Sequence, residues 1–364
     1  MKIMYFYASL RAGGAERMIS ALANYNAKQG VDVSIAVIDN LPSFYSLHQN
    51  VKLLNLWKLQ NSQNTRQVIK NTVRLVTLTR RAFKEVRPNC VVCFGINYLV
   101  YALMAKMFLN IKLIGSERSN PKYSDNGFWH KMKKIASPFA DGFIFQTNGA
   151  KKYYPKIVQK KSAVIPNGII VDNLPADSAL LSKCIPNSIC AVGNLSYVKG
   201  FDMLIRAFAV FSEVNSSYRL TIYGEGTERA KLEELISKLG LNDKVILAGR
   251  ISNVTEEISR REIFILSSRF EGMPNALIEG LACGCACIST NCDFGPNELI
   301  INEENGLLVP VDDINAMAAA MQKLASNPGL RKKIARNAVN IRNTHSIERI
   351  ADKYLAYITR IAHS

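Results

Sequence analysis

Residues 269–284 read RFEGMPNALIEGLACG and follow the apolar run at 263–266. Consecutive apolar residues bounded by polar ones predict a buried strand, and Gly272 with Pro274 predicts a tight turn after it. The apolar residues beyond the turn predict a helix that begins near Pro274 and Asn275. A buried strand, a turn and a helix together form the repeating unit of an α/β sheet.

The same unit recurs along the chain in both directions from this stretch. Short apolar runs alternate with helical stretches such as residues 15–29. The predicted strands are residues 2–8, 32–38, 90–94, 112–115, 142–146, 162–165, 189–192, 219–223, 244–248, 263–266, 287–290 and 306–309. This alternation predicts an α/β protein with two doubly wound, Rossmann-like domains and parallel sheets.

A segment rich in asparagine, proline and small residues, at 166–186, is the predicted linker between the two domains. The N-terminal domain then covers 1–172 and the C-terminal domain covers 173–345. We expect a final helix at about 346–364 to pack back onto the N-terminal domain. A length of 364 residues, of which 48% are hydrophobic, supports two such cores.

The composition predicts a soluble cytoplasmic protein. The most apolar stretch, 90–105, is shorter than the about 20 residues of a membrane span and contains Gly95 and Asn97. We interpret the N-terminal residues as mature structure because they have no signal-peptide cleavage region. Eight cysteines, with Cys90 and Cys93 as the one CxxC pair, predict buried free thiols in a reducing cytosol rather than a metal site.

The net charge of +17 lies entirely in the first half of the chain. Residues 1–175 hold 25 Lys and Arg against 8 Asp and Glu, whereas residues 176–364 hold 21 of each sign. The N-terminal domain is therefore expected to meet an anionic partner. A nucleic-acid binder would also be basic, but it would not account for Glu271 and Glu279, so we expect no nucleic acid.

Loops at the predicted carboxyl ends of four strands carry the residues that a ligand would use. Gly13 and Gly14 open a helix and leave its backbone uncovered for a phosphate, although turn geometry alone also explains them. Lys199, in the loop at 193–200, is unfavourable at a helix start unless an anion lies beside it; the alternative is a solvated lysine. A third loop covers 248–252.

The fourth loop is the opening stretch itself. Free N–H groups at the start of its helix can hold a diphosphate. Glu271 can accept hydrogen bonds from the hydroxyls of a bound polyol, and Glu279, about one turn into the helix, can accept two from a ribose diol. The alternative is that Glu271 is a turn residue and Glu279 an ordinary polar helix position.

Five motifs together resemble those of the retaining glycosyltransferases of family 4. They are GGAER at 13–17, VGNLSYVKG at 192–200, AGRISN at 248–253, EGMPNALIE at 271–279 and ACG at 282–284. The resemblance covers almost the whole chain and points to the bacterial enzymes that extend lipid-linked oligosaccharides or O-antigen units. It implies the GT-B fold, in which two Rossmann-like domains face each other across a cleft.

The resemblance implies a role for each of these loops. Glu271 would bind donor-sugar hydroxyls, Glu279 the ribose and Lys199 the β-phosphate, so Glu271 and Lys199 are the expected catalytic residues. The expected donor-binding residues are Gly13, Gly14, Arg17, Gly193, Lys199, Arg250, Ile251, Glu271, Gly272, Met273, Pro274, Asn275, Leu277 and Glu279.

Two positions depart from the pattern of the relatives. Asn194 stands where they carry an arginine, so Lys199 would carry the leaving-group charge with less help, or Arg17 or Arg118 would reach in. Arg118 stands where several of them have a histidine that contacts the acceptor side of the sugar. The expected acceptor-binding residues in this segment are Arg118, Ser119 and Asn120.

The implied reaction moves a hexose or N-acetylhexosamine, with UDP as the favoured carrier, to a lipid-linked glycan with retained configuration. The departing phosphate oxygen would take the acceptor's proton, while Lys199 and helix N–H groups stabilise the developing charge. No D-x-D triplet occurs in the chain, so we expect no metal and no other cofactor. The alternatives are a nucleotide-sugar epimerase of the same fold and a GDP-mannose-dependent mannosyltransferase.

Residues 66–87 predict an amphipathic basic helix. Its basic face carries Arg66, Lys70, Arg74, Arg80, Arg81, Lys84 and Arg87, and its apolar face carries Val68, Leu75, Leu78, Ala82, Phe83 and Val86. The expected acceptor contacts are Lys70, Arg74, Arg81 and Lys84. The alternative is a solvated face, which would include acids, and Glu85 is the only one. We therefore expect peripheral binding to anionic lipid, or to the acceptor's pyrophosphate, at the inner face of the cytoplasmic membrane.

Overall fold

The computed structural model describes residues 1–11, 13–56, 65–122, 127–171, 174 and 184–364. The chain divides into two compact units. Unit 1 comprises Met1–Gly168 and Ile347–Ser364, and unit 2 comprises Ile169–Ser346. The predicted domain boundary, between residues 172 and 173, lies outside the described residues.

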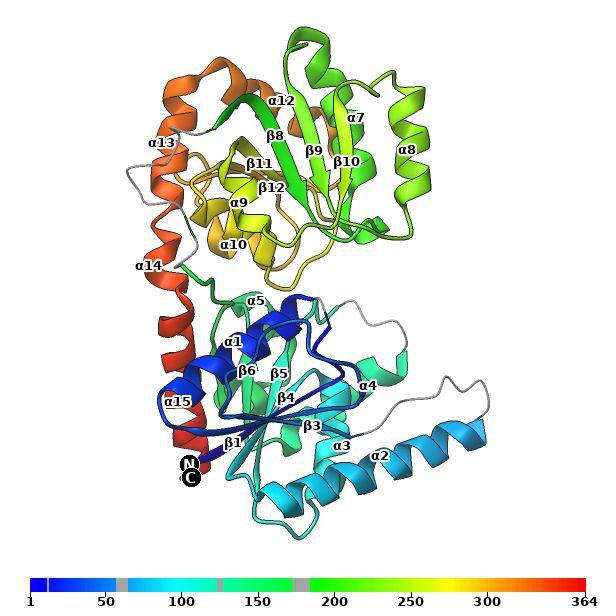
Figure 1. Cartoon of the computed structure of the whole chain (residues 1–364), viewed down its shortest axis with the longest axis vertical. Coiled ribbons are helices and arrows are strands. Elements are labelled where there is room, and N and C mark those ends of the chain that lie inside the picture. The colour runs from blue at the N-terminus through cyan, green and yellow to red at the C-terminus, as the bar shows by residue number, and fades with distance from the viewer. Residues whose placement is uncertain (12, 57–64, 123–126, 172–173, 175–183) are drawn as a thin grey trace. The chain divides into compact units, whose positions relative to one another are not determined.

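Unit 1 is built on a seven-stranded parallel sheet with the strand order β3-β2-β1-β4-β5-β6-β7 (Figure 1). Its strands are β1 (Lys2–Tyr7), β2 (Asp32–Val37), β3 (Val51–Asn55), β4 (Cys90–Phe94), β5 (Lys112–Glu117), β6 (Gly142–Phe145) and β7 (Ser162–Val164). Its helices are α1 (Gly14–Lys28), α2 (Thr65–Val86), α3 (Ile96–Lys106), α4 (Gly127–Ala136), α5 (Asn148–Tyr153), α6 (Lys156–Lys160) and α15 (Ile347–Ala362). Helices connect most consecutive strands because parallel neighbours need a crossover connection, whereas a loop at 38–50 joins β2 to β3.

Two hydrophobic layers enclose this sheet because successive side chains of a strand point to opposite faces. Tyr5 packs on one face in a cluster that includes Ile19 of α1 and Tyr354 of α15. Phe6 packs on the other face in a cluster that includes Phe83 of α2. The helix from the end of the chain, α15, is therefore part of the core of unit 1.

Unit 2 is built on a six-stranded parallel sheet with the strand order β10-β9-β8-β11-β12-β13. Its strands are β8 (Ile185–Val192), β9 (Arg219–Tyr223), β10 (Val245–Gly249), β11 (Arg261–Leu266), β12 (Ala286–Thr290) and β13 (Leu307–Val309). Its helices are α7 (Phe201–Val214), α8 (Arg229–Lys238), α9 (Val254–Ser259), α10 (Asn275–Ala282), α11 (Pro296–Leu299), α12 (Ile314–Ser326), α13 (Pro328–Ala338) and α14 (Ile341–His345). Apolar clusters lie on both faces, as they do in unit 1.

The predicted α/β class with two doubly wound parallel sheets is confirmed. Each predicted strand overlaps an observed one, with ends that differ by a few residues. The sequence prediction missed β3, Val51–Asn55, which lies at the edge of its sheet and is nowhere fully buried. An edge strand packs on one neighbour, so its sequence does not form the continuous apolar run of a central parallel strand.

Candidate active site

Lys199 and Glu271, the two residues expected to be catalytic, lie in direct contact. Lys199 Nζ donates a hydrogen bond to Glu271 Oε1 at 2.6 Å, and Ser268 Oγ donates to the same oxygen at 2.7 Å. The lysine side chain is 24% exposed and the glutamate side chain 11%. They follow β8 and β11, which are neighbours in the sheet. The pair therefore lies at the carboxyl edge, where an open α/β sheet binds its ligand.

Backbone geometry fixes the loop of Lys199. Tyr197–Lys199 forms a 3₁₀ turn, and Gly200 adopts a φ of +62° before α7 begins. A Cβ on residue 200 would lie 2.2 Å from the carbonyl oxygen of Ser267, so only glycine fits there. The Ser267 hydroxyl donates to the carbonyl of Lys199 at 2.8 Å. The turn is thereby held against the end of β11.

Arg269, two residues before Glu271, makes a dense set of polar contacts. Its Nη1 and Nη2 bond the Asp202 carboxylate at 2.9 and 2.8 Å, and its Nε bonds Asp312 Oδ1 at 2.7 Å. Nη1 also donates to the Tyr197 carbonyl at 2.8 Å, and the guanidinium lies 4.2 Å from the centre of that tyrosine ring. Burial acts to raise the pKa of Asp202, but the hydrogen bonds and charge of Arg269, together with backbone hydrogen bonds, outweigh burial, so the pKa is lowered.

The sequence analysis did not single out Arg269. The available signal was an arginine three residues after the apolar run at 263–266, in the same short stretch as Glu271. Its carboxylate partners lie far away in the sequence, at positions 202 and 312, so no local sequence pattern predicts these contacts.

The predicted helix start is confirmed: α10 spans Asn275–Ala282 and is preceded by Pro274. Glu279 is 3% exposed on this helix, so it is not an ordinary solvated position. Met273 and Leu277, also expected to bind the donor, are 7% and 0% exposed. Their side chains pack in an apolar cluster of unit 2. Gly272, at the turn, remains partly exposed.

Close backbone contacts shape the end of β8. The N–H of Gly193 donates to the carbonyl of Tyr223 at 3.0 Å. A Cβ on Gly224 would lie 1.8 Å from the carbonyl oxygen of Gly193, so the backbones at the ends of β8 and β9 leave no room for a side chain at residue 224. A Cβ on Gly193 would lie 3.3 Å from the Lys199 side chain. The lysine stem therefore runs along this glycine.

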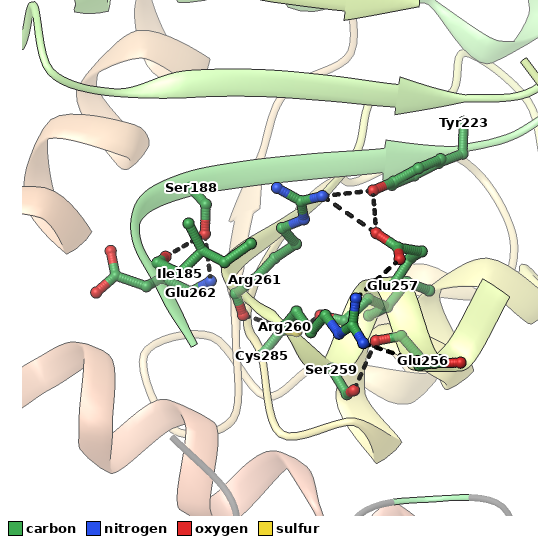
Figure 2. Close-up of polar contacts among 11 residues, drawn as sticks. Ile185, Ser188, Tyr223, Glu256, Glu257, Ser259, Arg260, Arg261, Glu262 and Cys285 are labelled. Carbon is green, nitrogen blue, oxygen red and sulfur yellow. Dashed lines mark hydrogen bonds and ion pairs between the residues drawn. The ribbon is translucent and has the colours of Figure 1, made fainter. Parts of the chain in front are cut away.

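A partly buried polar cluster joins β9, α9 and β11 (Figure 2). The Tyr223 hydroxyl donates to Glu257 Oε2 at 2.7 Å and accepts from Arg261 Nη2 at 2.6 Å. Burial raises the pKa of Tyr223 to about 12, and the hydrogen bond from Tyr223 lowers the pKa of Glu257. Glu257 lies on α9, which begins three residues after Ile251. The cluster thus holds α9, the helix that follows the loop of Arg250 and Ile251, the two residues expected to lie beside the base.

In unit 1, Tyr45 and Glu16 both lie against Gly13, the residue before α1. The Tyr45 hydroxyl donates to the Gly13 carbonyl at 3.0 Å and accepts from its N–H at 3.3 Å. Glu16 folds back so far that a Cβ on residue 13 would lie 2.2 Å from Glu16 Oε2. Burial raises the pKa of Glu16. Gly14 is exposed, and Arg17 is partly buried in the first turn of α1.

Arg118, an expected acceptor contact, is bound within unit 1. Its Nη1 donates to the Tyr354 hydroxyl at 2.9 Å, its Nη2 donates to Asn167 Oδ1 at 2.5 Å, and its guanidinium lies 4.9 Å from the centre of the Phe94 ring. Ser119 is exposed and Asn120 is 5% exposed. Of these three predicted residues, Ser119 is thus the one whose side chain is open to solvent.

The predicted basic helix is α2, and its expected acceptor contacts are all exposed: Lys70, Arg74, Arg81 and Lys84. Its buried apolar residues include Leu75, Ala82, Phe83 and Val86, as predicted. The side chain of Arg66 lies outside the described residues.

Two positions on α2 correct the predicted faces. Val68 is 48% exposed, next to Ile69 at 60%, because the first turns of α2 extend past α3, the helix it packs against (Figure 1). Arg80 is only partly exposed and donates to the carbonyls of Ala105 and Met107 at 2.8 and 2.6 Å. The exposed surface of α2 is therefore basic and partly apolar.

The described part of the chain has neither a membrane-spanning helix nor a metal-binding cluster of side chains. No described helix is both long enough and apolar enough to cross a bilayer. Within the same residues, no cluster of three or more His, Cys, Asp or Glu side chains could hold a metal ion. Seven of the eight cysteines are buried, Cys184 is partly exposed, and all are free thiols.

Two family profiles match the chain, one in each half. The family described as "Glycosyltransferase Family 4" matches residues 12–173. The family described as "Glycosyl transferases group 1" matches residues 179–340.

Similar proteins of known name include two from Campylobacter jejuni. The "N-acetylgalactosamine-N,N'-diacetylbacillosaminyl-diphospho-undecaprenol 4-alpha-N-acetylgalactosaminyltransferase" is 30% identical and covers 98% of this chain and 99% of its own. The "GalNAc-alpha-(1->4)-GalNAc-alpha-(1->3)-diNAcBac-PP-undecaprenol alpha-1,4-N-acetyl-D-galactosaminyltransferase" is 28% identical over 100% of both chains. Among solved structures, Alr3699/HepE from Anabaena in complex with UDP and glucose has a TM-score of 0.80 at 16% identity, covering 99% of each chain.

These matches agree with the two sheets and with the motifs at their carboxyl edges. The chain belongs to the GT-B glycosyltransferases of family 4 and is a hexosyltransferase.

Proposed function

We propose that this enzyme moves an N-acetylhexosamine or hexose from UDP to a lipid-linked glycan, with retained configuration, in surface polysaccharide or glycan assembly. The observation that carries the proposal is the Lys199–Glu271 pair, which lies at a sheet edge just before the start of α10. The names of the two Campylobacter relatives support an N-acetylhexosamine and an undecaprenol-linked acceptor. The UDP bound to the Anabaena protein supports UDP as the carrier.

In this proposal, the two charged side chains of the Lys199–Glu271 pair separate when the nucleotide-sugar donor binds. The diphosphate of the donor draws Lys199 Nζ from Glu271, because a phosphate offers a charged partner of its own. Glu271 is then left to accept hydrogen bonds from the hydroxyls of the donor sugar. The 24% exposure of the lysine side chain gives it access to such a ligand. Glu279 holds the ribose diol.

The residues then act on the leaving group. The bond from C1 to the diphosphate oxygen breaks, and the acceptor oxygen bonds to C1 on the same face. The departing phosphate oxygen takes the proton of the acceptor hydroxyl. Lys199 and the N-terminal end of α10 stabilise the charge that develops on the diphosphate. We propose that no metal or other cofactor is needed, because the chain has no D-x-D triplet.

The acceptor side of the proposal is the basic surface of unit 1. Lys70, Arg74, Arg81 and Lys84 of α2 attract the anionic inner face of the cytoplasmic membrane or the pyrophosphate of the lipid-linked acceptor. The exposed Val68 and Ile69 on the same helix add apolar contact with lipid. The enzyme would therefore work as a peripheral membrane protein.

A donor and acceptor screen tests this function. Purified protein is incubated with UDP-linked hexoses, UDP-linked N-acetylhexosamines and GDP-mannose, each with and without an undecaprenyl-diphosphate glycan, and the anomeric configuration is read by NMR. We expect transfer from a UDP-sugar with the configuration retained, and no loss of rate with EDTA. Transfer from GDP-mannose alone favours the mannosyltransferase, and epimerisation of the donor without acceptor favours the epimerase. Inverted product or a strict need for Mg²⁺ contradicts the proposed mechanism.

A further inference from the structure

Arg269 joins loops that follow three different strands of unit 2. Its own loop follows β11, its partner Tyr197 lies in the loop after β8, and its partner Asp312 lies beyond the end of β13. Asp202, its bidentate partner, lies in the first turn of α7. A single guanidinium therefore ties together the segments that carry Lys199 and Glu271.

The contacts of Arg269 leave it little capacity for a ligand. A guanidinium has five N–H donors, and four hydrogen bonds from its three nitrogens already go to Asp202, Asp312 and the Tyr197 carbonyl. Its side chain is only 9% exposed, and one face is covered by the ring of Tyr197. Any effect of Arg269 on the reaction must therefore pass through its neighbours.

The neighbour that matters is Lys199. The backbone N–H of Arg269 donates to the Val198 carbonyl at 2.8 Å, and its side chain holds the carbonyl of Tyr197. The backbone on the N-terminal side of Lys199 is thus fixed at two consecutive residues. A lysine side chain has four rotatable bonds, so the position of its ammonium depends on how firmly the backbone beneath it is held.

We propose that Arg269, held by Asp202, is a positioning residue that sets the place of the Lys199 ammonium relative to Glu271 and the departing diphosphate. This inference rests on the proposed function, because it gives Lys199 its role in stabilising the leaving group. Misplacement of a reacting group by about 1 Å costs on the order of 100-fold in rate. The planar fork of arginine can bond a carboxylate at two points, which lysine cannot do, so Arg269→Lys should restore only part of the function.

The test is a double-mutant cycle between Arg269 and Lys199. Four proteins are compared with the best UDP-sugar: wild type, Arg269→Gln, Lys199→Ala and the double variant. We expect Arg269→Gln to lower kcat about 10- to 100-fold with KM for the donor changed less than about threefold. In the Lys199→Ala background the same change should cost less than about threefold, because the ammonium that Arg269 places is absent. Arg269→Lys and Asp202→Asn should fall between wild type and Arg269→Gln.

Arg331→Gln is the matched control. Arg331 is also a partly buried arginine of unit 2, bonded to Glu262 at 3.1 Å and to the Leu324 carbonyl at 3.0 Å, but Glu262 lies at the amino end of β11. Thermal unfolding of each variant is measured beside kcat. We expect the two arginine variants to lose similar stability, and only Arg269→Gln to lose turnover.

The outcomes separate the inference from the function beneath it. If wild type transfers no sugar, or if Lys199→Ala is as fast as wild type, the proposed function fails. Lys199→Ala could instead be slow while Arg269→Gln lowers kcat by the same factor in the Lys199→Ala background as in wild type. In that case the proposed function stands and the positioning role is wrong. Equal loss of turnover in Arg331→Gln and Arg269→Gln would also overturn it, since loss of stability alone would then explain both.

Discussion

Two lysine–glutamate pairs, one in each unit, show how the same two side chains serve different purposes. In unit 1, Lys133 Nζ lies 3.2 Å from Glu117 Oε2, and the side chains are 8% and 3% exposed. In unit 2, Lys199 Nζ lies 2.6 Å from Glu271 Oε1, and the side chains are 24% and 11% exposed. Each glutamate lies at or just beyond the carboxyl end of a parallel strand. The difference is in what else each carboxylate bonds.

Glu117 is surrounded by donors from its own unit. Its Oε1 accepts from the Ser119 hydroxyl at 2.9 Å and from the N–H of Arg118 at 3.1 Å, and its Oε2 accepts from the Tyr154 hydroxyl at 2.5 Å. Glu271 accepts from Lys199 and Ser268, and both bonds use Oε1. A carboxylate bonded at both oxygens and buried holds a loop in shape, whereas one with solvent access can exchange partners with a ligand.

The largest effect expected from this difference is on stability. Lys133→Met leaves the Glu117 carboxylate buried without its cation, which should lower the free energy of unfolding by about 3–5 kcal/mol. Lys199→Met should cost only about 1–2 kcal/mol, because water reaches its pair. Denaturant unfolding of both variants measures the contrast.

The surface pair of Lys52 and Glu85 is the control for this measurement. Its atoms are 2.6 Å apart, yet the side chains are 53% and 61% exposed. Lys52→Met should therefore cost less than about 1 kcal/mol. Equal losses for Lys133→Met and Lys199→Met would show that the two pairs are equally structural, and the comparison would fail.

The two pairs also show what a sequence can and cannot predict. The strand, turn and helix around Glu271 follow from local apolar patterns, and the helix start at Asn275 was predicted correctly. The contact with Lys199 joins residues 72 positions apart, and nothing in either segment specifies the partner. Motif resemblance placed both residues at one site, but their direct ion pair is a property of the fold.

Errors in the sequence prediction have the same origin. Projection of residues 66–87 onto a helix places Val68 on the buried face, but among the side chains of α2 that the structure describes, from residue 68 onward, the first buried one is Asn71. A helical periodicity predicts the direction in which a side chain points, but it does not predict whether a neighbouring element extends far enough to cover that side chain. Arg118 likewise donates a hydrogen bond to Tyr354, which lies 236 positions away, so no local sequence pattern predicts this contact within unit 1.

A smaller effect is expected when the carboxylates at the edge of unit 2 are removed. Glu271→Ala and Glu279→Ala should each lower kcat/KM by about 10- to 100-fold, since one or two hydrogen bonds to the donor correspond to about 1–3 kcal/mol. Both proteins should remain folded by circular dichroism. Transfer at the wild-type rate in either variant would remove that glutamate from the donor site.

The smallest effect for each residue is expected for the exposed charges of α2, which lie on the surface rather than in a buried pair. The test variant changes four residues to glutamine: Lys70, Arg74, Arg81 and Lys84. Each should contribute about 1 kcal/mol of attraction to an anionic bilayer, within a Debye length of about 8 Å at physiological salt. Sedimentation with anionic liposomes and transfer to the lipid-linked acceptor should therefore decrease, while hydrolysis of the donor by water stays near normal.

A control with the same change in charge separates this surface from net charge alone. Four exposed cations of unit 2 are changed to glutamine in it: Lys238, Lys332, Lys333 and Arg336. Because these residues lie on the other unit, the control should keep its liposome binding and transfer.

The liposome binding of wild type and of the α2 variant should become equal as salt is raised, since salt screens exposed charges first. If the α2 variant binds liposomes as well as wild type at low salt, α2 is a solvated surface. If it loses donor hydrolysis and transfer equally, α2 instead supports the fold of the active enzyme, because a membrane contact would affect only the lipid-linked acceptor.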